Sequence, residues 1–465
     1  MRKNYYILAK ILGVAVFIVV VGLTYYYSSK KSTTNNFANI NKSKQTAMQQ
    51  EKIDFFSKYN LFYDTNVGDF VKNGEKVENG GGQFTSDFLY SDGSILSSYS
   101  DVLNKVYKGQ GSVGDVVDSS VSQNDYKLFF QGNVYGSSDW STSVLRDGDY
   151  IYYKKCLKVE FIKASNGNRC VDTALYSNND KVDEGGRPTD VYISTGVSNI
   201  DPLFIKNGVL YYGKMVGEKY EFYSYNPINK QSALFKPELF GNNENELLGI
   251  LDNEDIVFDN SIGIFKNSLQ SKVIDRTQIG DIFNKGEAIG NNYYYFNIRY
   301  DQKSVEQGHD LFKDDLLITK VNSTVYGRII NPDQQDCHFS DYIYGFSTPM
   351  YCINKEGTIV RLDSKTNTGN LQNANKAIST DVVYIINNDL VDFSRFWTTI
   401  GNLEKSTKSV SLIFDEKGNV SSLVIDASDE KSASNIYLAP YLGDGKIGEP
   451  QILVSNANLF GVTKK

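Results

Sequence analysis

The stretch Asp147-Gly-Asp-Tyr-Ile-Tyr-Tyr153 gives the clearest indication of how this chain folds. A polar turn of Asp and Gly leads into a short run of Tyr and Ile, which is typical of a turn that enters a buried β-strand. Similar stretches recur downstream, at Asn207–Tyr212, Asn291–Phe296, Ser340–Gly345 and Thr380–Ile385. A repeated unit of turn and strand therefore organises the chain.

The spacing of these units predicts the architecture. The better units start near residues 150, 209, 256, 293, 342, 383 and 436, an irregular repeat of about 48 residues. Four-stranded propeller blades joined by variable loops have this period. We therefore predict an all-β fold, a β-propeller of about seven or eight blades over residues 85–465. Tandem β-sandwiches and a β-solenoid are the alternatives.

The individual repeats resemble those of bacterial extracytoplasmic, membrane-anchored β-propeller proteins. The resemblance rests on Asp147–Tyr153 with Ala174-Leu-Tyr176, and on Ser340–Tyr344 with Thr358-Ile-Val-Arg-Leu362. It implies a turn, an aromatic strand and a second strand in each unit. The likeness concerns the fold and implies no particular activity, since one fold serves many functions.

Composition and charge narrow the class of protein. The chain has 465 residues with 33 Tyr and 26 Phe, residues that favour half-buried pleated strands. Residues 1–50 carry seven Lys or Arg and no acid, so the remainder holds 41 basic against 55 acidic residues. Nucleic-acid binding needs a basic face that neutralises phosphates. An acidic body therefore argues against nucleic acid as a partner.

The N-terminus contains the uncharged run Ile11–Tyr27. A helix from Tyr5 to Tyr27 would be roughly 35 Å long, enough to span a bilayer with some tilt. A cleaved signal peptide and a buried core helix are the alternatives. The run ends in three tyrosines without a small-residue cleavage site, and Lys or Arg residues flank it on both sides. These features favour a single membrane anchor over residues 11–27.

The four cysteines form two closely spaced pairs, Cys156 with Cys170 and Cys337 with Cys352. Pairs that lie beside predicted strands, with no odd thiol, predict two local disulfides and an oxidising compartment. Four free buried thiols are the alternative. A metal site does not fit, because there is no C-x-x-C and the only nearby histidine is His338. The cysteines therefore favour a cytoplasmic N-terminus and a body outside the cell membrane.

These observations divide the chain into four parts. Residues 1–10 form a short cytoplasmic tail, and residues 11–27 form the anchor. Residues 28–84 form a stalk and leading segment, because Ser28 to about Gln50 is too polar to bury a core. Residues 85–465 form the propeller.

A search for catalytic motifs is negative, and we assign no catalytic residue, no metal ligand and no cofactor. The two histidines, His309 and His338, are read as polar loop or strand residues. Carboxylates are the remaining chemical groups, and all six candidates lie in turns, where Asp commonly caps the backbone. They are Asp147, Asp149, Asp252, Asp255, Asp314 and Asp315. The acidic stretches 251–255 and 178–184 lack the spacing of a calcium loop and are read as solvated turns.

One aromatic segment breaks the strand pattern. Residues 390–400 carry Phe393, Phe396 and Trp397 without alternation, which predicts a loop or short helix. These three side chains either pack against the body or form an exposed binding patch.

Together these features predict a membrane-anchored binding or scaffold module for an envelope protein or glycan, because propeller loops converge on one surface. The alternative is a glycoside-active enzyme that uses Asp or Glu at the propeller channel. A sensory ectodomain is less favoured, since only about ten residues precede the anchor.

Overall fold

The computed structural model describes most of the chain after residue 48. The described residues are 49–65, 69–77, 84–100, 126–131, 133–136, 144–162, 167–185, 200–217, 219–240, 245–260, 262–268, 272–275, 282–300, 306–321, 328–340, 350–365, 381–401, 407–428 and 434–465. Two compact units are distinguished, residues 1–59 and residues 60–465. In the first unit, the described part is a helix over residues 49–58, in which the Phe55 ring lies 5.1 Å from that of Phe56.

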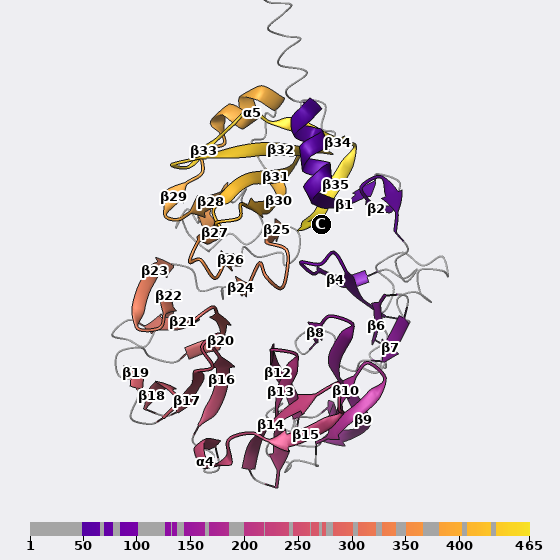
Figure 1. Ribbon diagram of the computed structural model, residues 1–465, viewed down its shortest axis with the longest axis vertical. Coiled ribbons are helices and arrows are strands. Elements are labelled where there is room, and N and C mark those ends of the chain that lie inside the picture. The colour runs from indigo at the N-terminus through magenta and orange to yellow at the C-terminus, as the bar shows by residue number, and fades with distance from the viewer. Residues whose placement is uncertain are drawn as a thin grey trace, which may run out of the picture. The chain divides into compact units, whose positions relative to one another are not determined.

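The second unit is all-β, as predicted, and its described strands form eight sheets (Figure 1). Five of them are four-stranded meanders in which consecutive strands pair antiparallel. The strands of the first two are β4 (Phe84–Leu89), β5 (Ile95–Ser100), β6 (Tyr126–Phe130) and β7 (Asn133–Gly136), then β8 (Leu145–Asp147), β9 (Tyr150–Ile162), β10 (Gly167–Ser177) and β11 (Asp180–Glu184). The next two contain β12 (Ile200–Lys206), β13 (Val209–Val216), β14 (Lys219–Asn226) and β15 (Gln231–Leu234), then β16 (Glu246–Ile250), β17 (Ile256–Asn260), β18 (Gly263–Lys266) and β19 (Lys272–Asp275). The fifth contains β20 (Ile282–Ile289), β21 (Asn292–Tyr300), β22 (Glu306–Lys313) and β23 (Leu316–Val321). A one-turn helix, α4 (Pro237–Phe240), precedes β16.

The stretch 147–153 forms the predicted turn and strand. Asp147 ends β8, Gly148 turns at a φ of 55°, and Tyr150 opens β9. Successive residues of β9 point to opposite faces of the sheet, as in any strand. Tyr153 packs in one core cluster with Leu128, whereas Tyr152 packs in another with Tyr212. Both faces of this sheet are therefore covered by neighbouring sheets, which is why the strand is continuously apolar and aromatic.

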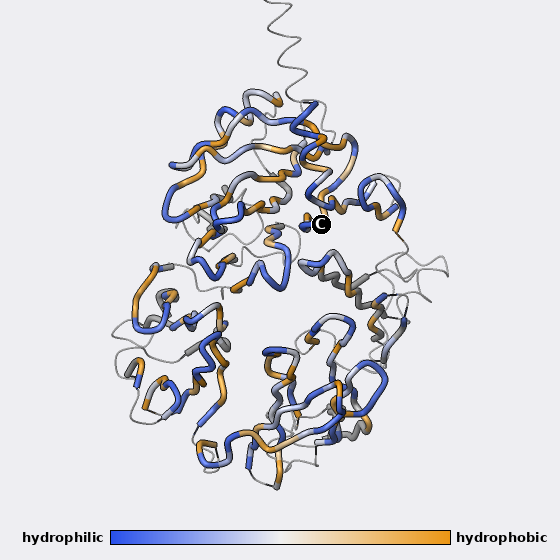
Figure 2. The backbone as a smooth tube through the Cα atoms, in the orientation of Figure 1, coloured by the Kyte–Doolittle hydropathy of each residue, from blue (hydrophilic) through white to orange (hydrophobic). Residues whose placement is uncertain are grey.

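The same arrangement repeats along the body. In β21, Tyr293 and Tyr295 join a cluster with Val257, while Tyr294 and Phe296 join a cluster with Tyr351. Hydrophobic and hydrophilic segments alternate along the backbone of the sheets (Figure 2). Each meander is thus attached to the next through a shared aromatic core. Continuous aromatic runs at positions 150–153 and 293–296 are the sequence signature of strands buried on both faces.

One strand, β25, crosses between the last two sheets of the chain. One sheet has the order β24 (Arg328–Ile330), β26 (Met350–Ile353), β27 (Ile359–Lys365), β28 (Asp381–Ile386) and β29 (Asp389–Leu390), with β24 and β26 parallel. The other has the order β25 (His338–Ser340), β30 (Thr407–Phe414), β31 (Val420–Ser428), β32 (Ser434–Gly443) and β33 (Lys446–Ile447), and β34 (Gln451–Ser455) also pairs with β32. Between β24 and β26, the chain therefore crosses to the next sheet to supply β25. The predicted hairpin at residues 410–425 is confirmed as β30 and β31.

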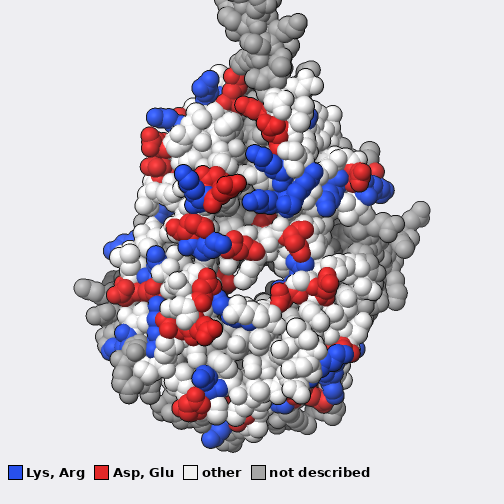
Figure 3. Space-filling view, viewed as in Figure 1, with Lys and Arg blue, Asp and Glu red and all other residues white. Residues whose placement is uncertain are grey.

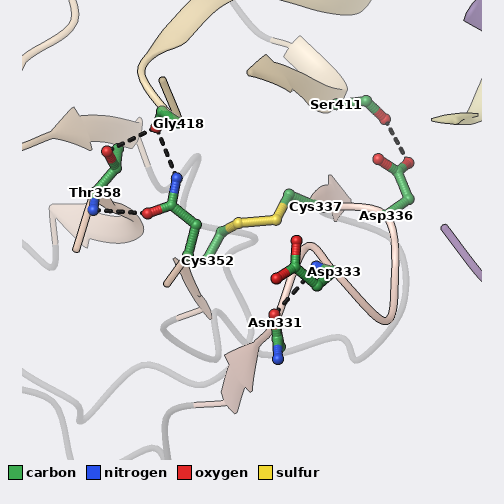
Figure 4. The surroundings of a disulfide bond; sticks show 9 residues. Asn331, Asp333, Asp336, Cys337, Cys352, Thr358, Ser411 and Gly418 are labelled. Carbon is green, nitrogen blue, oxygen red and sulfur yellow. Dashed lines mark hydrogen bonds between the residues drawn. A yellow bond between two sulfur atoms is a disulfide. The ribbon is translucent and has the colours of Figure 1, made fainter. Parts of the chain in front are cut away.

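The disulfide between Cys337 and Cys352 is confirmed and fastens this crossing (Figure 4). It links the residue before β25 to β26, with the two Cα atoms 5.8 Å apart. For the other cysteine pair, the register sets Cys156 opposite Thr173 on β10 and Cys170 opposite Val159 on β9. That bond remains a prediction.

The two ends of the body share one sheet, with the order β3 (Glu75–Lys76), β2 (Phe70–Lys72), β1 (Tyr59–Thr65) and β35 (Ala457–Lys464). Strand β35 also contacts β30 and β32 of the preceding sheet, so the last sheets connect back to the first. The β body thus begins near residue 60, earlier than the predicted residue 85. Repeated small antiparallel sheets joined in succession are consistent with a β-propeller-like fold.

Some predictions fall outside the described residues. They are the tail, the anchor over residues 11–27, the stalk to residue 48 and the expected strand at residues 342–344. Within the described ranges, no helix is long and apolar enough to cross a membrane.

Candidate functional site

A polar cavity of about 730 Å³ lies where the first turns of successive sheets meet. Its wall is built from the turns after β4, β8, β12, β16 and β20, from residues 331–335 and from Lys355. Acidic and basic side chains gather around the opening in this part of the molecule (Figure 3). The turn residues of the repeats at Asp147 and Asn207 therefore lie in the wall of one cavity, together with Gly290 before the repeat at Asn291.

Ion pairs join neighbouring turns around this cavity. Arg146 at the end of β8 pairs with Asp92 in the turn after β4, and Lys206 at the end of β12 pairs with Asp252 in the turn after β16. Lys355 Nζ lies 3.8 Å from Asp333 Oδ2. Of these pairs, the one between Lys355 and Asp333 is exposed on both sides and contributes little to stability. The effect of these pairs here is to neutralise most of the carboxylates that line the cavity.

Asp92 shows how these contacts set the charge of the wall. Burial opposes its ionisation, but hydrogen bonds from Arg146 and from the backbone and hydroxyl of Ser94 outweigh burial and lower the pKa of Asp92. The Arg146 guanidinium also stacks over the Tyr90 ring, 4.7 Å from its centroid. The Arg146 side chain therefore bridges the sheet of β8 and the turn after β4.

Asp147 differs from Asp92, Asp252 and Asp333, the other aspartates in the wall. Its carboxylate faces the next turn, because a Cβ added at Gly208 would lie 3.7 Å from Asp147 Oδ2. Among the described residues it makes no ion pair. Asp147 is therefore a wall aspartate without an ion-pair partner among the described residues.

The structure brings together two of the six carboxylate candidates, Asp147 and Asp252, and places the others elsewhere. Asp255 accepts hydrogen bonds from Asn253 and Asn267 at 2.9 and 2.6 Å. Asp314 accepts one from the Tyr293 backbone and pairs with Lys266. Asp149 accepts a bond from Gln131 at 3.3 Å, and Asp315 lies exposed in a turn. Capping and pairing explain this second group.

In the two acidic stretches that were compared with calcium loops, several carboxylates also bond to side chains of the protein. In 178–184, Asp183 accepts hydrogen bonds from Tyr212 and Lys214, and Glu184 pairs with Lys181. In 251–255, Asp252 pairs with Lys206. No group of three metal-ligating side chains occurs in the described part of the chain.

Sequence reasoning missed a buried polar group near the disulfide. Ser411, fully buried on β30, donates its hydroxyl proton to Asp336 Oδ2 at 3.0 Å and contacts His338 Nδ1 at 2.9 Å (Figure 4). Burial raises the pKa of Asp336 to about 7 and lowers the pKa of His338 to about 4. Because the Ser411 proton points to the carboxylate and the hydroxyl is inaccessible, this group is structural.

The predicted aromatic patch lies on a short helix, α5 (Ser394–Ile400). Phe396 is 0% exposed and packs in the core of the last two sheets, with its ring 5.5 Å from that of Tyr437. Phe393 and Trp397 are half-buried against the same core. Phe396 is therefore unable to contact a partner, which corrects its place in the patch. Contact through Phe393 and Trp397 remains a prediction.

Comparisons with known proteins identify no family. No family model matches the chain, and no curated protein sequence matches it. Among solved structures, it is similar to the extracellular domain of a candidate one-component system from B. thetaiotaomicron, with a TM-score of 0.24 and 10% sequence identity. The similarity covers 84% of this chain and 45% of that one, so the chain spans under half the length of that protein.

Proposed function

We propose that the chain is a membrane-anchored, extracytoplasmic β-propeller that acts as a binding or scaffold module for an envelope protein or glycan. The observation that carries this proposal is the cavity of about 730 Å³ at which the turns of six sheets converge. Its size is that of a small-ligand site or a receptor for one segment of a larger partner. Its wall presents backbone turns, paired charges and the unpaired carboxylate of Asp147.

Binding is better supported than hydrolysis. A glycosidase needs one carboxylic acid with a raised pKa beside a second, ionised carboxylate. Among the described aspartates, burial raises the pKa of Asp64 and Asp336, and neither lines the cavity. The cavity carboxylates of Asp92, Asp252 and Asp333 each pair with a Lys or Arg. Paired carboxylates suit recognition of a polar ligand.

The location outside the membrane rests on the sequence and on one bond. The apolar run 11–27 supports an anchor, and the disulfide between Cys337 and Cys352 fits an oxidising compartment. Labelling of intact cells with a membrane-impermeant lysine reagent tests this location. Modification of the body only after the membrane is opened would contradict it.

Site-directed photocrosslinking in native membranes tests the binding function. A photoreactive residue at Asn207, in the cavity wall, is expected to capture a partner, whereas one at Ile228, 85% exposed and outside the wall, is not. The product's mass and its sensitivity to protease or periodate distinguish a protein partner from a glycan. Equal capture from both positions would show that the cavity is not the binding site.

A glycoside-active enzyme is the second candidate, because Asp147 and Asp252 both line the cavity. If the protein hydrolyses a glycan, Asp147→Asn and Asp252→Asn should each lower the rate by at least about 100-fold, the scale of general acid–base catalysis. Asp315→Asn, outside the cavity, is the matched control.

A further inference from the structure

A second cavity, of about 250 Å³, lies between β23 of one sheet and β27 and β28 of the next. It shares no lining residue with the cavity of the first turns. Its described lining is about equally polar and apolar, and the apolar part comes from side chains that include Leu317, Ile359 and Ile385. One cationic side chain, Arg361, also lines it.

Arg361 has no acidic partner. Its guanidinium hydrogen-bonds to the Thr319 hydroxyl, and its Nε is shielded from solvent without a hydrogen-bond partner. Among the described residues, no Asp or Glu lines this cavity and no ion pair of Arg361 occurs. On β27 it lies opposite Tyr351 and Ile385. A guanidinium without a carboxylate partner among the described residues keeps a charge that an anionic ligand in the cavity would neutralise.

Asn387 adds a polar group to the same wall. Its side-chain Oδ1 accepts a hydrogen bond from the Ile359 backbone at 3.0 Å, which fixes the amide. The side-chain NH₂ group is the part left to donate to a ligand. The cavity therefore offers hydrogen-bond donors from Arg361 and Asn387 beside the apolar side chains of its lining.

We infer that this cavity binds the carboxylate of a small organic anion. A planar guanidinium matches a planar carboxylate in a forked pair of hydrogen bonds, and the single positive charge balances one negative charge. A phosphate dianion would need a second cation, and no Lys or other Arg in the described part of the chain lines the cavity. The apolar side chains of the lining accommodate the carbon skeleton of the ligand.

Titration calorimetry on the full chain in a non-ionic detergent tests this site. Butyrate and glucuronate are the probes, butanol and glucose are their neutral counterparts, and inorganic phosphate is the competing anion. At least one acid should bind, and its neutral counterpart should not. Arg361→Met should weaken binding by about 10- to 100-fold, the value of a charge-assisted hydrogen bond, and Arg361→Lys by less. Arg395→Met, an exposed arginine on α5, should leave it unchanged.

The outcomes are distinct. Binding of butyrate alone indicates an alkyl ligand, and binding of glucuronate indicates a sugar acid. Phosphate binding as tight as that of the acids, equal binding by Arg361→Met, or no binding of either acid at tens of millimolar would overturn the inference. Thr319→Val, which keeps the charge and removes the hydroxyl that orients it, should weaken binding severalfold if Arg361→Met fails to fold. Because the two cavities are separate, a negative calorimetry result would not affect the binding function that the photocrosslinking at Asn207 tests.

Discussion

The meanders from β8 to β23 and the sheets from β24 to β35 all share buried apolar clusters with their neighbours, but they differ in how their strands are ordered. In the first region, each sheet uses consecutive strands, and clusters of buried Tyr, Phe and Leu join it to its neighbours. In the second region, β25 crosses between sheets, and polar contacts cross with it. Thr358 Oγ1 and Asn354 Nδ2, on the turn after β26, both donate to the Gly418 carbonyl in the next sheet, at 2.7 and 2.6 Å.

Buried carboxylates hold the last strand in this second region. Asp336 accepts a hydrogen bond from the Val462 backbone at 2.9 Å, and Asp426 accepts one from the Leu459 backbone at 3.0 Å. Both carboxylates are buried. Apolar clusters join the sheets in both regions, and ion pairs such as that between Lys154 and Asp201 also link the meanders. Where distant segments must meet, specific polar bonds and a covalent bond fix which strands pair.

The largest expected effect is in the meander region. Phe258→Ala should lower the free energy of unfolding by about 4 kcal/mol, because a fully buried ring at the joint of two sheets is lost and leaves a cavity. Leu234→Ala, at a side chain 45% exposed on β15, should cost under about 1 kcal/mol. Urea unfolding measures both. A similar loss in the two variants would show that aromatic clusters do not join these sheets.

Removal of the Cys337–Cys352 bond should have a somewhat smaller effect in the closing region. The double variant Cys337→Ala/Cys352→Ala should lose about 3 kcal/mol, because the unfolded chain regains the freedom of a loop whose ends are 15 residues apart. Urea unfolding with and without reductant measures this loss. In reductant, wild type should match the variant, and any shift of the variant on addition of reductant reports a bond between Cys156 and Cys170. An unchanged midpoint in the variant would mean that the crossing does not need the bond.

The pH dependence of wild-type stability gives the smallest net effect, because two titrations of about 1.4 kcal/mol per pH unit act in opposite directions. Burial raises the Asp336 pKa from 3.8 to about 7, so its contribution is present below pH 3.8 and is lost as the pH rises through about 7. Burial lowers the His338 pKa from 6.5 to about 4, so its contribution is present above pH 6.5 and is lost as the pH falls through about 4. Between pH 4 and 6.5 the two effects oppose each other.

Single substitutions should separate these effects. Asp336→Asn should leave a protein that gains stability from pH 4 to 6.5, and His338→Gln one that loses stability from pH 4 to 7. Urea unfolding at half-unit pH intervals measures the slopes. Slopes of both variants equal to that of wild type would contradict the assigned titrations.

Local pattern was sufficient to predict the strands of the regular sheets. Asp147–Tyr153 and Asn291–Phe296 show polar turns that lead into aromatic runs, and both form the expected hairpin elements. The short helix near Phe396 and the hairpin at residues 410–425 follow from the same reasoning. The place of Asp147 in a cavity was not predictable, because a turn residue has the same local sequence whether it faces solvent or five neighbouring turns.

By itself, the sequence determined the all-β class, the repeated turn and strand and one local cysteine pair, since these depend on residues close together in the chain. The tertiary structure decided that β1 and β35 share a sheet, that β25 crosses to another sheet, and that Asp336 is buried beside Ser411 and His338. It also decided that Arg361 lies in a cavity without a carboxylate partner among the described residues. These features join residues up to about four hundred positions apart, such as Asn60 and Thr463. Hydrophobic periodicity within a short window carries no information on which distant segments meet.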